Sequence, residues 1–282
     1  MSALKSVLVC MCGVLLLTGC GAGTKATTVT TSAPVATVTQ SATPTTTASG
    51  SPATTASGIV IASAKTMKSY IDAEASADAN VMREGLELAA PNSAAYLYLD
   101  HVANMAEAAL DGGRPYRKGA VTPVGDDAFK TCNDLADEKT CTTLGDFRMD
   151  AAGKLVDLTV NKQPIASRLT AGSSEAVTSG GAKFTVLTAY ETVTSDQLIV
   201  TVEVETGAKP IWVYTSKASY RGPDGKKRAA TSAGGPTDID AKSNTVVYMG
   251  FPSIKAGGKV TLGGCVGKDC SGGQFTAVLK VG

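Results

Sequence analysis

Apolar residues recur at intervals of three and four between residues 63 and 111, which predicts helices in this part of the chain. Pro91 breaks the run, because proline disfavours helical backbone in the residue before it. Ser93 is then placed to cap a second helix over 94–111, which the glycine pair at 112–113 should end. The helical spacing rests on Met67, Tyr70, Ile71, Glu74, Ala75, Val81, Met82 and Leu86, and then on Tyr98, Val102, Met105 and Ala109.

From Ala120 the pattern changes to short stretches of strand character. Thr143–Met149 and Lys154–Val160 predict two strands, and Asp150–Gly153 predicts the hairpin turn between them. Residues 63–165 are therefore expected to form a small α+β domain, with two helices followed by a short antiparallel sheet. This order of helices and strands resembles the cone-shaped NTF2-like domains of actinobacterial envelope proteins, and the resemblance implies a fold of that kind.

Residues 166–282 have almost purely the pattern of β-strands. Apolar residues alternate strictly from Leu198 to Val204, while the opposite face of that strand becomes polar toward one end, as in a half-buried strand. Pro223-Asp224-Gly225 predicts a turn, because proline fixes φ and glycine permits the left-handed conformation. About seven strands separated by turn signals predict a β-sandwich. We expect these strands at Phe184–Tyr190, Gln197–Glu205, Ile211–Tyr214, Ala218–Arg221, Thr245–Phe251, Val260–Leu262 and Phe275–Val281.

Three stretches of this region are similar to Ig-like domains of unknown function in bacterial lipoproteins. Leu198–Ile211 has their long strand of alternating valines, followed by a short loop and a restart at proline. Tyr220–Lys226 resembles their Asp-Gly-Lys hairpin, and Ile254–Val260 resembles the approach to a late strand, with Ala256 where proline is usual. The resemblance covers residues 168–282 and implies an Ig-like β-sandwich, but no activity. The whole chain resembles uncharacterised actinobacterial lipoproteins.

An apolar run near the N-terminus is too short to cross a bilayer. It covers Val7–Leu17 after a single charge, Lys5, whereas a membrane-spanning helix needs about 20 apolar residues. The run closes on Leu17-Thr18-Gly19-Cys20, which resembles the lipobox of bacterial lipoprotein signal peptides. This implies that residues 1–19 are removed and that Cys20 carries acyl chains such as palmitate. We expect an extracytoplasmic protein anchored to the outer face of the cytoplasmic membrane. An uncleaved helix and an unlipidated secretory signal are the alternatives.

Residues 20–62 differ in composition from everything that follows. After Cys20 they are mostly Thr, Ala, Ser, Pro, Val and Gly, and Lys25 is the only charge in 21–58. Such a segment buries too little apolar surface to offset the entropy cost of ordering, so we expect a disordered tether. Its Thr-rich, Pro-punctuated composition leaves two hypotheses open, a glycosylated stalk and a plain linker.

Four of the seven cysteines are available for disulfides. Cys10 and Cys12 belong to the expected signal peptide, and Cys20 to the lipid anchor. An even number of cysteines in an extracytoplasmic protein predicts disulfide bonds. The pairing of neighbours in sequence is Cys132–Cys141 and Cys265–Cys270. Metal ligation is the rival hypothesis, but neither pair has the C-x-x-C spacing typical of zinc sites.

The charges of the mature chain would balance. The full chain has 26 Lys and Arg against 25 Asp and Glu, and residues 1–19 contain Lys5 but no acid, which leaves 25 of each sign. A chain without net charge has no long-range field to steer it toward nucleic acid. We therefore expect no nucleic-acid partner and only local electrostatic recognition.

No catalytic or cofactor motif stands out in the sequence. The G-x-S-x-G and G-x-x-x-x-G-K-[ST] motifs are absent, so we assign no catalytic residue and no cofactor. His101, beside Asp100, is predicted to be a packing or surface residue of the second helix, with a general base as the alternative. Several acids lack the spacing of a calcium loop and are predicted to be solvated rather than a metal site, namely Asp126, Asp127, Asp134, Asp137 and Glu138.

Two groups of residues are candidates for a binding surface. Trp212 is expected in the core of the sandwich, which would turn Ile211 and Val213 outward. The alternative places Trp212 and Tyr214 on an exposed aromatic face that binds sugars or proteins. The second group is a basic hairpin tip, either a solvated turn or a contact for anionic headgroups or acidic wall polymers, formed by Arg221, Lys226, Lys227 and Arg228.

Together these patterns favour a non-catalytic envelope lipoprotein. Its Ig-like domain is predicted to act as a binding or scaffolding module for an envelope protein or wall component. The alternative is a carrier that holds a small apolar ligand in a pocket of the α+β domain. A third hypothesis is an enzyme that uses His101 with nearby acids.

Overall fold

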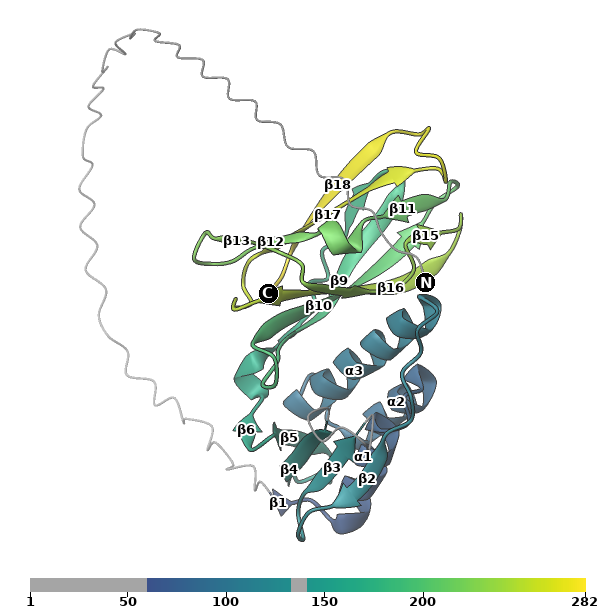
Figure 1. The fold of residues 1–282 in the computed structure, drawn as a ribbon. Helices are drawn as coiled ribbons and strands as arrows, with labels where there is room; N and C mark the ends of the chain where they lie inside the picture. Colours follow the sequence, from purple (N-terminus) through teal and green to yellow (C-terminus); the bar gives the residue numbers. More distant parts are fainter. Residues whose placement is uncertain (1–59, 133–140) are drawn as a thin grey trace, which may run out of the picture. The chain divides into compact units, whose positions relative to one another are not determined.

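The computed structural model describes residues 60–132 and 141–282, which build three α-helices and three antiparallel sheets (Figure 1). The helices come first in the chain, and strands make up most of the remainder. The predicted class, α+β followed by all-β, is confirmed at this level. No helix in the described residues is both long enough and apolar enough to cross a membrane.

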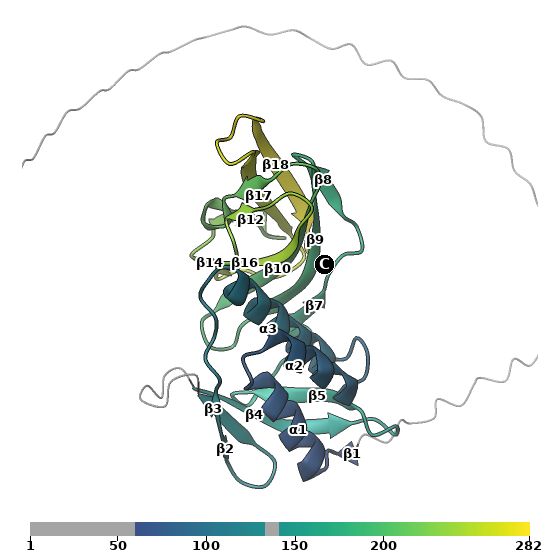
Figure 2. The same cartoon turned by 90° about the vertical axis from the view of Figure 1, so that its right-hand side faces the viewer.

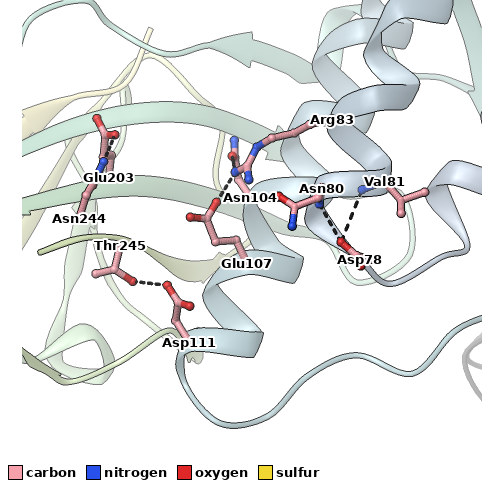
Figure 3. Close-up of polar contacts among 10 residues, drawn as sticks. All are labelled: Asp78, Asn80, Val81, Arg83, Asn104, Glu107, Asp111, Glu203, Asn244 and Thr245. Carbon is pink, nitrogen blue, oxygen red and sulfur yellow. Dashed lines mark hydrogen bonds and ion pairs between the residues drawn. The ribbon is translucent and has the colours of Figure 1, made fainter.

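The first predicted helix is two helices. α1 (Ala64–Glu74) and α2 (Ala79–Gly85) are separated by a turn in which Ala77 has a positive φ of 60°. Asp78 starts α2, because its carboxylate accepts hydrogen bonds from the amides two and three residues further on (Figure 3). The prediction of one continuous helix was wrong, because this cap offers the backbone an alternative to continuing α1.

α3 (Ala94–Asp111) begins and ends where the sequence predicts. Ser93 Oγ accepts a hydrogen bond from the Tyr96 amide at 3.2 Å, and Gly112 caps the other end. Two contacts then hold the C-terminal half of α3 in place (Figure 3). Arg83 of α2 forms an ion pair with Glu107, and the Thr245 hydroxyl donates to the Asp111 carboxylate at 2.7 Å.

The first sheet packs against the three helices. Its strands lie in the order β2-β3-β4-β5-β6, and β1 pairs with β4. The β4–β5 hairpin and its turn at Asp150–Gly153 are confirmed, since the Asp150 amide donates to the Lys154 carbonyl at 2.9 Å. The strands are β1 (Val60–Ile61), β2 (Ala120–Pro123), β3 (Phe129–Cys132), β4 (Cys141–Met149), β5 (Leu155–Val160) and β6 (Gln163–Pro164).

The second and third sheets face each other across a separate core. All seven predicted strands of this region are present, as β9, β10, β11, β12, β16, β17 and β18. The second sheet has the order β14-β16-β10-β9-β7, with β8 on β9, and the third has β13-β12-β17-β11-β15, with β18 on β17. The strands are β7 (Leu169–Ala171), β8 (Val177–Ser179), β9 (Ala182–Glu191), β10 (Gln197–Thr206), β11 (Ile211–Val213), β12 (Ser219–Arg221), β13 (Lys227–Ala229), β14 (Ser232–Gly234), β15 (Asp238–Ile239), β16 (Asn244–Pro252), β17 (Lys259–Val266) and β18 (Gln274–Lys280).

α3 covers the outer face of the second sheet, where it lies against β16, β9 and β10 (Figure 2). The alternating face of β10 points into the core as predicted, with Leu198 and Val204 both fully buried. β10 was predicted to be half-buried, and this was wrong at Thr201, which lies on the opposite face and is 0% exposed. Its burial follows from the helix that covers this face.

The helices thus join the two halves of the described chain. The core between the first sheet and the helices also contains Leu169 and Tyr190, which belong to the second sheet. Residues 60–282 fall within one compact unit. The division into domains at residues 63–165 and 166–282 stays a prediction.

Candidate ligand-binding site

A cavity of about 280 Å³ opens beside α3. Its walls come from α1, α2, α3, β4, β9, β10 and the segment that follows α3. This volume is near the lower end for ligand pockets, and the mixture of apolar walls with a few polar groups is typical of them. The apolar and aromatic lining includes Met82, Tyr98, Val102, Met105, Tyr190 and Ile199.

His101 lines this cavity with one ring nitrogen lacking a hydrogen-bond partner. The side chain is 1% exposed, and its Nδ1 lies 2.7 Å from Thr188 Oγ1 on β9. Its Nε2 has no partner among the described residues. Burial lowers the pKa of the imidazole to about 3, so the ring is neutral at physiological pH. The prediction of a packing residue is confirmed by its burial, but the ring also faces an open space.

The hydrogen bonds behind His101 assign its tautomer. Thr201 Oγ1 accepts from the Thr188 amide at 3.1 Å and donates to the Thr188 carbonyl at 3.3 Å. Thr188 Oγ1 then donates to Thr201 Oγ1 at 2.7 Å and accepts from His101 Nδ1–H. If Thr188 Oγ1 instead donated to His101 Nδ1, the ring proton would be on Nε2, where it would be buried without an acceptor. We therefore assign the proton to Nδ1, which makes Nε2 a hydrogen-bond acceptor.

Tyr190 contributes a second unpartnered polar atom to the same cavity. Its hydroxyl is buried and has no acceptor for its own proton within the described chain, although the Val193 backbone approaches its oxygen. The ring lies edge-on to His101, with centroids 5.7 Å apart, and edge-on to Tyr98 at the same distance. Burial raises the pKa of the Tyr190 hydroxyl to about 12, although the nearby Val193 backbone acts in the other direction. The group is therefore a neutral hydrogen-bond donor.

Glu74 is the acid that shares the cavity with His101. It ends α1, and burial raises the pKa of its carboxyl to about 7, although a hydrogen bond with the Thr131 side chain lowers it. The carboxyl is therefore partly protonated near neutral pH. Arg117, an exposed cation, also lines the cavity. Asp100, which adjoins His101 in sequence, does not line the cavity.

Sequence reasoning did not single out Glu74, Tyr190 or the two threonines behind His101. One signal was available for Glu74, because it occupies a position on the apolar stripe of its helix. A carboxylate at such a position is either paired or has a shifted pKa. The other three residues carry no comparable signal, since they lie on strands far from His101 in the sequence.

The structure pairs the four cysteines as expected from their spacing. Cys132 is bonded to Cys141, and Cys265 to Cys270. Cys20 lies outside the described residues, as do the signal peptide and most of the tether. No group of three or more potential metal ligands occurs within residues 60–132 and 141–282. Asp134, Asp137 and Glu138 lie outside these ranges.

Trp212 lies on the outer surface of the third sheet, so its expected place in the core was wrong. Its side chain is 36% exposed, whereas Ile211 and Val213 are 1% and 0% exposed. The strand places its two β-branched residues in the sandwich core, and the alternation of side chains then turns Trp212 outward. Tyr214 is partly exposed, and its hydroxyl contacts the Cys265–Cys270 disulfide at 3.6 and 3.5 Å.

The basic hairpin tip is formed by β12 and β13. Gly225 has a φ of 76° in the turn between the two strands, as the Pro-Asp-Gly sequence predicts. Arg221, Lys226 and Lys227 are exposed, and Arg228 is partly exposed. The tip and the cavity therefore lie on different parts of the fold, one on the third sheet and the other beside α3.

Comparisons of this chain with protein-family models, with curated proteins and with solved structures find no match.

Proposed function

We propose that this protein is a lipid-anchored extracytoplasmic binding protein that holds a small molecule in the cavity beside α3. One observation carries the proposal. Of the three buried side-chain polar atoms without a partner in the described chain, two belong to residues that line this cavity, namely His101 Nε2 and Tyr190 Oη. Buried polar groups nearly always have a hydrogen-bond partner, so these atoms indicate a missing one.

The two atoms define the chemistry of the ligand. His101 Nε2 accepts a hydrogen bond and the Tyr190 hydroxyl donates one, so together they match a hydroxyl or a primary amide. The remaining lining is aromatic and aliphatic around Tyr98, Val102 and Ile199. A small neutral molecule with an apolar body and one such polar end satisfies both parts. This favours the carrier hypothesis over catalysis, because a base with a pKa of about 3 removes protons poorly at neutral pH.

Small probes test the cavity directly. Phenol, benzyl alcohol and benzamide should cause saturable shifts in backbone amide resonances around α3 and β9 of the full chain. Val102→Phe fills the cavity from α3 and should abolish the shifts. Val81→Phe is its matched control, because Val81 is 40% exposed on α2 and does not line the cavity. Tyr190→Phe keeps the ring, and losing one hydrogen bond should weaken binding about fivefold.

Two outcomes would contradict this function. Shifts that persist in Val102→Phe would place the probes elsewhere, and a protein unaffected by all the probes would indicate a cavity that holds only water. A dispersed amide spectrum shows that each variant is folded, so loss of binding is not mistaken for loss of structure.

The lipid anchor is the second part of the proposal and is supported by the lipobox-like sequence before Cys20. Two disulfides are compatible with an oxidising compartment outside the cytoplasm. Cys20→Ser should abolish the incorporation of labelled fatty acid into the protein in the producing cells, because it removes the acyl-chain acceptor. Intact-mass analysis of the wild type should find an acylated N-terminal Cys20. An unmodified Cys20 would contradict the anchor.

The finer fold assignments and the second binding role also remain proposals. The facing sheets of residues 166–282 support an Ig-like sandwich, and the helices on the first sheet support an NTF2-like domain. We further propose that the sandwich contacts a component of the envelope. The exposed Trp212 supports this contact, because tryptophan is enriched at interfaces, where one part of the ring is buried and its N–H meets a polar partner.

A further inference from the structure

Four cations lie side by side on the outer face of the third sheet. The register of the antiparallel strands places Lys227 of β13 opposite Arg221 of β12 and Arg221 opposite Lys259 of β17. Lys259 is in turn opposite Lys280 of β18. Directly opposite residues in a sheet point to the same face, so the four side chains form one cationic row.

The cationic row points to solvent. The residues that adjoin it along the strands, Tyr220, Val260 and Leu279, are 0%, 0% and 1% exposed and belong to the core. All four cations are exposed. Within the described chain none of them forms an ion pair, and Arg221 alone makes a side-chain hydrogen bond, to the Gly225 carbonyl at 2.9 Å.

Such a row is unfavourable for the isolated protein. Neighbouring strands lie about 4.8 Å apart, so four positive charges follow one another over about 14 Å. Like charges directly opposite each other destabilise a sheet. The arrangement becomes favourable when an anionic surface lies against it.

Apolar side chains share this face with the cationic row. Val278 lies two residues before Lys280 on β18 and is 47% exposed. Trp212 is 36% exposed and pairs with Cys265 of β17. Cys265 is on the same side of β17 as Lys259, so Trp212 shares the face of the cationic row. Tryptophan is enriched at the interface between membrane and water, and cations beside it are attracted to anionic headgroups. A soluble polyanion would need the cations but not the apolar side chains.

We infer that this face of the third sheet lies on an anionic lipid bilayer, with the cationic row over the headgroups and Trp212 and Val278 at the interface. The inference rests on the proposed envelope contact of the sandwich and names its partner. If Cys20 is lipidated as proposed, the anchor keeps the sandwich near the membrane, so a weak contact is occupied much of the time.

Vesicle binding tests the inference without the anchor. The protein is the mature chain from residue 20 carrying Cys20→Ser, which lacks the apolar run Val7–Leu17. Its sedimentation is compared with vesicles of phosphatidylcholine alone and with vesicles that contain an equal part of phosphatidylglycerol. Lys259→Gln with Lys280→Gln should reduce partition onto the anionic vesicles about 25-fold, since each cation near such a surface contributes about fivefold. The matched control is Lys65→Gln with Lys118→Gln, which removes the same charge from exposed positions outside the third sheet and should bind as well as the parent.

Each result decides the inference. Equal partition of the two double variants would overturn it, and so would equal binding of the parent to neutral and anionic vesicles. A third result would also overturn the membrane contact. If the parent binds soluble polyphosphate but not vesicles, and the Lys259 and Lys280 variant loses that binding, the cationic row recognises a polymer. A failure of Cys20 lipidation in cells leaves this result unchanged, because no arm of the experiment carries acyl chains.

Discussion

Thr201→Val should lower the free energy of unfolding by about 2–4 kcal/mol, although the two side chains have nearly the same shape. The Thr201 hydroxyl is fully buried and contacts Thr188 at its amide, its hydroxyl and its carbonyl. The register of β9 and β10 shifts at this point, so the Thr188 amide bonds a side chain instead of the partner strand. Valine would leave that amide without a partner.

The measurement is thermal unfolding of the variant beside a matched control. A loss of this size corresponds to a fall in Tm of roughly 4–16 °C for a protein of this length. Thr185→Val is the control, because Thr185 lies on β9, the strand of Thr188, and its hydroxyl makes no hydrogen bond within the described chain. Equal Tm values for the two variants would contradict the role assigned to the Thr188–Thr201 pair.

Glu74→Gln should make the protein about 2 kcal/mol less stable as the pH falls from about 7.5 to about 5, while the wild type changes little. His101 has a pKa of about 3 in the fold against about 6.5 in the unfolded chain. Below about pH 6.5 the unfolded chain therefore binds a proton that the folded chain does not, and acid favours unfolding.

Glu74 acts in the opposite direction over the same range. Its carboxyl has a pKa of about 7 in the fold, above its ordinary value of 4.5, so the folded chain takes up the proton first as the pH falls. Stability from this group is present below about pH 4.5 and is lost as the pH rises through about 7. The contributions of Glu74 and His101 nearly cancel in the wild type, and removing either one should reveal the other.

Paired variants separate the two groups. Glu74→Gln keeps only the His101 dependence and should lose roughly 4–8 °C in Tm on acidification. His101→Gln retains an amide that can donate to Thr188, and it should become more stable by about 2 kcal/mol over the same pH range. Other titrating groups, such as Asp100, are common to all three proteins and do not affect the differences. Three parallel pH profiles would refute this account of the cavity.

The longer elements were predictable from local signals. Ser93 and the glycine after α3 define its ends, and strict alternation defines β10. Nine short strands were missed, since each has only two to four residues and is held by its neighbours rather than by its own pattern: β1, β2, β3, β6, β7, β8, β13, β14 and β15. The inward side of β11 could not be chosen from sequence, because both of its faces carry large apolar residues around Trp212.

The candidate site depends on contacts that no local pattern contains. His101 meets Thr188 across 87 residues of sequence, and the shared cavity with Glu74 and Tyr190 exists only after α3 has packed on the second sheet. A search for catalytic motifs could not reveal a binding site built from an acceptor and a donor on different elements.

The single histidine of the chain makes the central claim directly observable. With isotope-labelled histidine, the two ring-nitrogen resonances belong to His101 alone. We predict a neutral ring protonated at Nδ1 down to about pH 5, since its pKa is about 3, and an Nε2 resonance that shifts when a small alcohol or amide binds. An imidazole that titrates near its ordinary pKa, or an Nε2 resonance that no bound probe shifts, would contradict the proposal that this cavity binds a ligand through His101.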